Sequence, residues 1–143
     1  MLSGEMVQGV LTLYYYFNLH LEQYLKDSWL SFQELALLYT LFYRNGANQD
    51  ALCHASQLDK STVSRSLNSL EKKGFIERSR NDLDQRKKNI YLTPAAYAQK
   101  KNIDSTLGSW VEKVLLPKNE EEHALWMRSI MEISYRASLT NSI

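Results

Sequence analysis

Hydrophobic residues recur at helical spacing along most of the chain, which predicts a mainly α-helical protein. The first helix is expected near residues 8–25, where apolar side chains follow the helical repeat: Val7, Val10, Leu11, Tyr14, Leu21 and Leu25. The run Tyr14–Phe17 is apolar nearly all round the helix. We therefore expect this first helix to contact partners on more than one side.

A second helix is expected to begin after Ser31, where the start signal is complete. Ser31 and Glu34 have the spacing of a capping box, and Leu30 and Leu35 occupy the two positions of a hydrophobic staple. The helix is expected to stop at Gly46, because glycine readily adopts the backbone conformation that ends a helix.

Two short helices joined by a tight turn are expected next. Asn48 offers a cap for the first, residues 56–58 form the turn, and Asp59 caps the second, which ends at Gly74. One stripe of the second helix is apolar and is expected to be buried, namely Val63, Leu67 and Leu70. This order of elements is typical of a helix-turn-helix.

The pattern then changes to the alternation of strands. Residues 75–78 and 89–92 are expected to pair as a hairpin across the polar turn 81–86. A hairpin that directly follows a helix-turn-helix is a wing. The sequence therefore predicts a mainly α protein with a small two-stranded β-hairpin, arranged as a winged helix-turn-helix.

Two further helices complete the expected fold. Thr93 and Pro94 form a cap followed by proline in the first helical position, and the long helix that they begin is expected to run towards Leu116. Asn119 offers a cap for the last helix, and the acidic residues of its first turn stabilise the positive end of the helix dipole.

Length and composition are those of an ordinary globular chain. The 143 residues suit a single domain, with 44% hydrophobic and 23% charged residues. No apolar run approaches the roughly 18 residues that a membrane span needs, and Met1–Met6 lacks the basic start of a secretory signal peptide. Cys53 is the single cysteine, which excludes an intrachain disulfide. We expect a cytoplasmic protein without a membrane partner.

Charge is distributed unevenly although the net charge is only +1. Residues 59–92 contain nine Lys and Arg against five Asp and Glu, a local charge of +4, whereas the remainder has eight against eleven, or −3. A basic segment in an acidic remainder suits contact with phosphates. A solvated helix face beside a charged loop is the alternative interpretation.

The second helix of the helix-turn-helix carries groups that suit a DNA groove. It is expected to begin at Lys60 or Ser61, and small hydrogen-bonding residues with one arginine are expected to face outward: Ser61, Thr62, Ser64, Arg65 and Asn68. The major groove admits one helix, where such side chains reach phosphates and base edges. No acidic residue stands between Lys60 and Leu70, whereas an ordinary surface helix more often carries Glu and Lys pairs.

The wing adds a second cationic element. Arg86 lies near its tip and is followed by Lys87 and Lys88. An arginine on a narrow projection fits a minor groove, where the negative potential is enhanced. Asp84 is expected to support the loop or hold Arg86 in place. A charged loop without a preferred partner is the alternative.

Four short stretches resemble the MarR family of regulators: Leu58–Arg65, Leu70–Arg78, Asp84–Arg86 and Leu92–Pro94. They cover about the middle third of the chain, and the outer helices agree only in number and placement. The resemblance implies a homodimer that binds a pseudo-palindromic DNA site, with the outward residues of the second helix in the major groove and Arg86 in the minor groove. The family often has glycine shortly after Leu-Thr-Pro, where this chain has Ala95 and Ala96.

The expected organisation is one domain over residues 1–143. Within it, residues 47–93 form the winged helix-turn-helix DNA-binding lobe, and residues 5–26 and 94–140 supply the dimerisation helices. The expected function is a homodimeric, sequence-specific double-stranded DNA-binding transcriptional regulator that represses its operator. A winged-helix module that binds protein and not DNA is the alternative, because fold does not fix function.

Other candidate chemistry is sparse. Cys53 falls where a small core residue is usual, so a redox role is disfavoured, and the histidines His20, His54 and His123 lack the spacing of metal ligands. The aromatic residues of the outer helices favour a core or an interface, although a small aromatic effector that releases the DNA is a further candidate partner. No catalytic motif is present, so we expect no enzyme activity, no metal and no cofactor.

Overall fold

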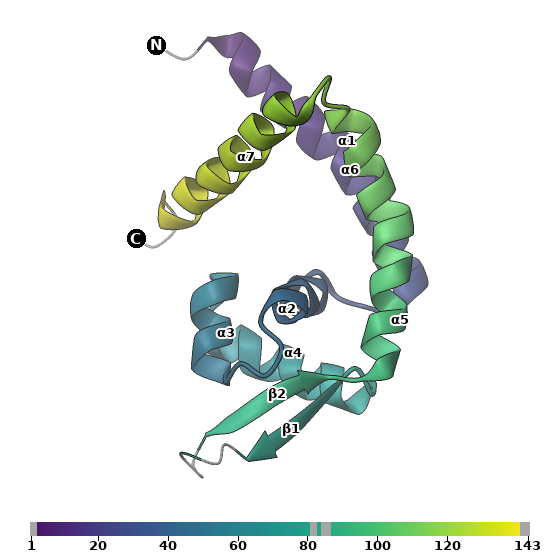
Figure 1. The fold of residues 1–143 in the computed structure, drawn as a ribbon, viewed down its shortest axis with the longest axis vertical. Helices are drawn as coiled ribbons and strands as arrows, with labels where there is room; N and C mark the ends of the chain where they lie inside the picture. The colour runs from purple at the N-terminus through teal and green to yellow at the C-terminus, as the bar shows by residue number, and fades with distance from the viewer. Residues whose placement is uncertain (1–2, 81–82, 84–86, 141–143) are drawn as a thin grey trace. The chain divides into compact units, whose positions relative to one another are not determined.

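The computed structural model describes residues 3–80, 83 and 87–140, and the chain divides into two compact units, residues 1–107 and 108–143. The first unit contains the winged helix-turn-helix and its flanking helices (Figure 1): α1 (Gly4–Ser28), α2 (Phe32–Tyr43), α3 (Gln49–Ser56), α4 (Lys60–Lys72), β1 (Ile76–Arg80), β2 (Lys88–Leu92) and α5 (Pro94–Ile103). The second contains α6 (Ser109–Leu115) and α7 (Glu120–Thr140). The predicted fold class is confirmed.

The helix starts read from local spacing are confirmed in atomic detail. The backbone N–H of Glu34 donates to Ser31 Oγ at 3.1 Å, and the backbone N–H of Ser31 donates to Glu34 Oε2 at 2.8 Å, so the capping box is complete. Asn48 Oδ1 accepts from the backbone N–H of Ala51 at 2.9 Å and caps α3. Each cap satisfies backbone donors that the helix itself leaves unpaired.

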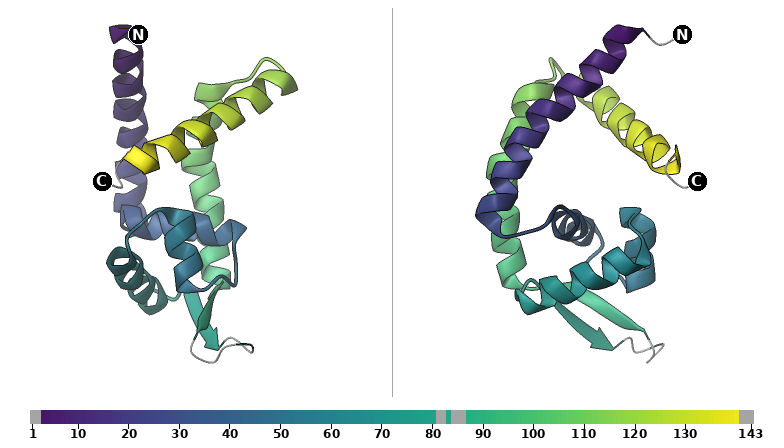
Figure 2. Two further views of the ribbon diagram at one scale, coloured as in Figure 1. Left: turned by 90° about the vertical axis from the view of Figure 1, so that its left-hand side faces the viewer. Right: turned by 180° about the vertical axis from the view of Figure 1, so that it is seen from behind.

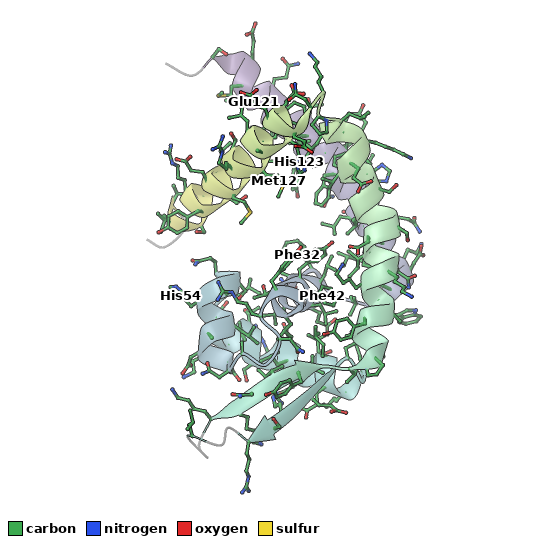
Figure 3. All side chains as sticks on the ribbon, viewed as in Figure 1. Phe32, Phe42, His54, Glu121, His123 and Met127 are labelled. Carbon is green, nitrogen blue, oxygen red and sulfur yellow. The ribbon has the colours of Figure 1, made fainter. Side chains whose placement is uncertain are left out.

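The core of the first unit lies among α2, α3, α4 and the hairpin. Its fully buried side chains are nearly all leucine, isoleucine or valine: Leu37, Leu38, Leu41, Leu52, Val63, Leu67, Leu70, Ile76, Ile90 and Ile103. The predicted inner stripe of α4 therefore faces this core. Phe42 points from α2 toward α5 (Figure 3), where its ring centroid lies 6.2 Å from that of Tyr97 and 5.8 Å from Lys100 Nζ.

The loop before α3 is attached to the hairpin by backbone hydrogen bonds. The N–H of Gly46 donates to Ile90 O at 2.8 Å, and the N–H of Ile90 donates to Ala47 O at 2.9 Å. Gly46 has a φ of +89°, and a Cβ there would lie 3.0 Å from the Tyr91 ring. Glycine at this position therefore allows both the turn and the close approach of β2.

The antiparallel hairpin pairs Ile76 with Leu92 and Arg80 with Lys88, and it projects from the end of the first unit opposite the start of α1 (Figure 2). Both strands are longer by one or two residues toward the turn than the sequence predicted, because the polar ends of the strands pair as well. Asp84 and Arg86, predicted to support and form the tip of the wing, lie outside the described residues.

Two expectations about the region after the hairpin were wrong in detail. Thr93 precedes α5 as predicted, but its side chain makes no capping bond, because its hydroxyl donates instead to Gly74 O at 2.6 Å. The helix predicted to run unbroken towards Leu116 is interrupted by a π-helical turn, Asp104–Gly108. Within that turn, the Thr106 hydroxyl donates to Asn102 O at 2.6 Å, a type of bond that commonly bends helices.

A large apolar surface is exposed on the outer helices. In α1 it includes Met6, Val7, Val10, Leu11, Leu13, Tyr14, Tyr15, Tyr16 and Leu19. From Ser109 to Thr140 no described residue is buried, and α7 exposes Leu125, Met127, Ile130, Met131, Ile133, Tyr135 and Leu139. In the described part of the chain, none of these helices is apolar over a length that would span a bilayer.

Candidate nucleic-acid interface

The start of α4 is held by one carboxylate. Asp59 Oδ1 accepts from the backbone N–H of Thr62 at 2.8 Å, and Asp59 Oδ2 accepts from the Thr62 hydroxyl at 2.6 Å. These bonds, the side-chain bond first, lower the pKa of Asp59 below its ordinary value. Since the hydroxyl proton of Thr62 is already used and the residue is half-buried, Thr62 presents mainly acceptor lone pairs and a methyl group.

The opposite faces of α4 differ as the sequence predicted. Lys60, Ser61, Arg65 and Asn68 are exposed and Ser64 is half-buried, whereas the core-facing stripe is fully buried. A helix period of 3.6 residues places these polar positions together on one side. The outer face of α4, defined by these five residues, therefore carries cations and short hydrogen-bonding groups on a rigid helix.

Arg78 of β1 joins the hairpin to this face. Its Nη1 donates to Glu71 Oε2 at 2.5 Å and to Asn68 Oδ1 at 3.0 Å. The Arg78 side chain is 18% exposed, so this cation is held at the surface of α4 and is not extended into solvent. Sequence reasoning missed this role, because Arg78 was counted only toward the local charge and its partners lie on another element.

A surface hollow of about 410 Å³ lies beside α4. It is lined by residues of the α3 start, α4 and the hairpin: Asn48, Gln49, Asp50, Ser64, Asn68, Arg78, Lys87, Lys88 and Ile90. The structure thus brings Ser64 and Asn68 of the predicted helix to the same hollow as Lys87 and Lys88 of the predicted wing. Lys60, Ser61, Thr62 and Arg65 are not part of its lining.

The model of the MarR family matches residues 30–88, which contain α2, α3, α4 and β1. This part of the chain, which holds the helix-turn-helix, is similar to the MarR family. A curated relative, the HTH-type transcriptional regulator BilQ of Clostridium symbiosum, is 34% identical over 91 residues. The matched region makes up 62% of this chain and 63% of BilQ, so it spans less than two thirds of the relative's length. The resemblance to this family that the four sequence stretches carry is confirmed.

Solved structures support the fold over nearly the whole chain. Streptococcus pneumoniae FabT, whose structure is a complex with DNA, has a TM-score of 0.72 at 20% identity and covers 97% of this chain and 100% of FabT. Bordetella bronchiseptica BpsR, whose DNA binding is regulated by 6-hydroxynicotinic acid, has a TM-score of 0.71 at 18% identity, covering 94% and 96%. At these identities the likeness establishes the fold alone.

Some cations of the basic segment, residues 59–92, are paired within the chain and are not free to contact a partner. Lys73 Nζ lies 2.7 Å from Glu34 Oε2, and Arg78 is paired with Glu71. Among the described cations of residues 59–92, Lys73 and Arg78 therefore have intramolecular partners. Lys60 and Arg65 remain exposed on the outer face of α4, and Lys87 and Lys88 are exposed at the hairpin.

Cys53 has the environment of a core thiol. It is half-buried and packs against the hydrophobic core of the first unit. Burial, followed by the nearby charge of Asp50, raises the pKa of the Cys53 thiol above its ordinary value. A raised pKa reduces the thiolate fraction, the form that reacts with oxidants. Among the described residues, no cluster of three His, Cys, Asp or Glu could hold a metal ion.

A second hollow, of about 420 Å³, lies between α1 and α5 with its following π-helical turn. Tyr24 donates from its hydroxyl to Gln99 Oε1 at 3.1 Å across these two helices. The other lining residues are mostly polar: His20, Gln23, Asp27, Ser28, Asn102, Ser105, Thr106 and Leu107. Tyr24 is the one aromatic residue in this lining.

Proposed function

We propose that this protein is a MarR-family, sequence-specific, double-stranded DNA-binding transcriptional regulator that acts as a homodimer. The observation that carries the proposal is the outer face of α4, where Lys60, Arg65 and Asn68 are exposed on a helix whose opposite stripe is completely buried. The DNA complex of FabT, which has the same fold, and the similarity to the transcriptional regulator BilQ support it.

In the proposed complex, α4 enters the major groove and the hairpin lies along the neighbouring backbone. Lys60, Arg65, Lys87 and Lys88 contact phosphates, which supply most of the affinity. Base edges are read by Ser61, Ser64, Arg65 and Asn68, with Thr62 contributing its methyl group and acceptor lone pairs. Arg86 reaches the minor groove with support from Asp84, a proposal that rests on sequence alone.

Homodimerisation is supported by the exposed apolar surface of α1 and α7. Large exposed apolar surfaces mark interaction sites in soluble proteins. A two-fold dimer presents two copies of α4, which suits a pseudo-palindromic operator with half-sites about 34 Å apart, one helical turn of DNA. Occupation of an operator that overlaps a promoter represses transcription.

Release by a small aromatic effector is part of the proposal. It is supported by BpsR, whose DNA binding responds to 6-hydroxynicotinic acid. The hollow between α1 and α5 is a candidate site, although its polar lining favours a ligand with several hydrogen-bonding groups over a purely apolar one.

A mobility shift with a salt titration tests the proposal. The probe is the DNA upstream of the protein's own coding sequence, and a duplex of shuffled sequence is the competitor. We expect a shift that resists the competitor and weakens steeply with salt. The variant Lys60→Ala/Arg65→Ala should lose the shift, whereas Lys101→Ala, which removes an exposed cation from α5, should retain it. Binding to neither DNA would instead favour a protein-interaction module.

A further inference from the structure

The side-chain amide of Asn68 has a fixed direction. Its Oδ1 accepts from Arg78 Nη1 at 3.0 Å, although Asn68 itself is exposed on α4. A guanidinium group only donates hydrogen bonds. The opposite amide orientation would place the NH₂ group against another donor, so Oδ1 must face β1 and Nδ2 must point away from it.

Arg78 is itself held in the position that imposes this direction. The same Nη1 donates to Glu71 Oε2 at 2.5 Å, and Glu71 lies three residues after Asn68 on the same helix face. The Arg78 side chain is only 18% exposed and is anchored through its strand to the hairpin. A charge-assisted bond to a carboxylate is stronger than a neutral one, so Glu71 secures the arginine while the arginine orients the amide.

An amide with this orientation discriminates between purines. Asparagine reads adenine with both of its groups, since Oδ1 accepts from N6 while Nδ2 donates to N7. Guanine presents two acceptors, O6 and N7, and requires only donors. From the geometry we infer that Arg78 is a positioning residue that makes Asn68 a donor toward DNA, so that Asn68 selects guanine over adenine. This inference rests on the proposed DNA-binding function.

The cations of the outer face of α4 fit this assignment. Arg65 and Lys60 carry only hydrogen-bond donors. Asn68 adds a further donor, because its NH₂ group points away from β1. A donor-rich helix complements acceptor-rich base edges. The hollow beside Asn68 is lined by Arg78, Lys87 and Lys88, which add further donors. Asp50 is the one carboxylate in this lining.

The test measures base preference at each operator position. The operator is first located by footprinting, and duplexes carrying each base pair at each position are titrated by fluorescence anisotropy. We expect one position per half-site at which guanine is preferred over adenine on the order of tenfold, and Asn68→Ala should remove this preference. Arg78→Met, which keeps the long side chain but has no donor, should reduce it to within about twofold because the amide is then free to turn.

Two matched variants separate positioning from charge and folding. Arg80→Met removes a cation from the same strand and should leave the guanine preference unchanged. In the double variant Arg78→Met/Glu71→Gln, the carboxylate that Arg78→Met leaves unpaired is also removed. This variant should lose the guanine preference. Its thermal unfolding transition checks that it is folded.

The inference is overturned if either Arg78 variant keeps the guanine preference, if the wild-type protein prefers adenine where Asn68→Ala has its effect, or if Asn68→Ala weakens all duplexes equally. Each of these results leaves the proposed function intact. Failure of the wild-type protein to bind any duplex would overturn the proposed function together with the inference.

Discussion

The ammonium group of Lys73 donates to the carboxylate of Glu34 at 2.7 Å and so joins the end of α4 to the first turn of α2. The Glu34 side chain is 5% exposed and that of Lys73 is 33% exposed. Lys73 Nζ also donates to Trp29 O at 2.6 Å, and Glu34 completes the capping box of α2. One carboxylate therefore caps α2 and holds the end of α4 against it.

Removal of the lysine should destabilise the fold. Lys73→Met leaves the Glu34 carboxylate buried without its cation, and we expect the free energy of unfolding to fall by roughly 1–3 kcal/mol. Chemical denaturation followed by circular dichroism measures the change. Lys72→Met, at the exposed neighbouring position, is the control and should stay within about 0.5 kcal/mol of wild type. Equal effects of the two substitutions would show that the ion pair is not stabilising.

Acid should weaken the protein through the same group. Burial raises the pKa of Glu34, but hydrogen bonds from Lys73, Ser69 and the Ser31 backbone outweigh it, and the net pKa is lowered from 4.5. A lowered pKa in the folded state means that the stabilisation is present above the unfolded value and is lost as pH falls through the folded value. The denaturant concentration at the unfolding midpoint of the wild type should therefore fall as the pH decreases below 4.5. For Glu34→Gln this fall should be shallower. Parallel pH profiles would contradict this.

Phosphate contacts at the hairpin predict a change in salt dependence. Lys88→Ala should weaken binding to all duplexes and flatten the slope of log affinity against log salt by about 0.9 for each contact removed. Anisotropy titrations between low and moderate salt measure the slope. Lys118→Ala, an exposed cation in the second unit, is the control. An unchanged slope and affinity would remove Lys88 from the interface.

Arg65 should contribute to specificity as well as affinity. Arg65→Ala is expected to cost about 1–3 kcal/mol on the operator if the guanidinium makes a bidentate base contact. Titration of the operator set distinguishes the two roles, because loss of a base contact relaxes one position. A uniform loss over all duplexes would identify Arg65 as a phosphate contact only.

The apolar face of α1 should hold the dimer together. Leu11, 63% exposed, lies in the middle of this surface. A charge there would have to be buried without a partner, so Leu11→Glu should shift the protein from dimer to monomer in analytical ultracentrifugation. Gln8→Glu, on the same helix outside the apolar set, should remain dimeric. A wild-type protein that sediments as a monomer at micromolar concentration would refute dimerisation.

Contacts between near neighbours in the chain were predictable. The capping box of Ser31 and Glu34, the Asn48 and Asp59 caps and the buried stripe of α4 depend on separations of three or four residues. Thr93 shows the limit of this approach, because its hydroxyl found a backbone acceptor at Gly74 and left the cap without a side-chain bond. The π-helical turn likewise carried no signal that outweighed a continuous helical pattern.

The chain's own pattern of hydrophobic, capping and basic residues was sufficient to predict the mainly α winged fold and the outward face of α4, because helix periodicity and capping act over a few residues. Folding alone decided that Lys73 and Arg78 are held in intramolecular pairs, that Asn68 turns its nitrogen outward, and that Ser64 meets Lys88 at one hollow. These relationships join elements that pack side by side from separate parts of the chain, and a hydrogen bond between them depends on three-dimensional distance, which residue spacing does not encode.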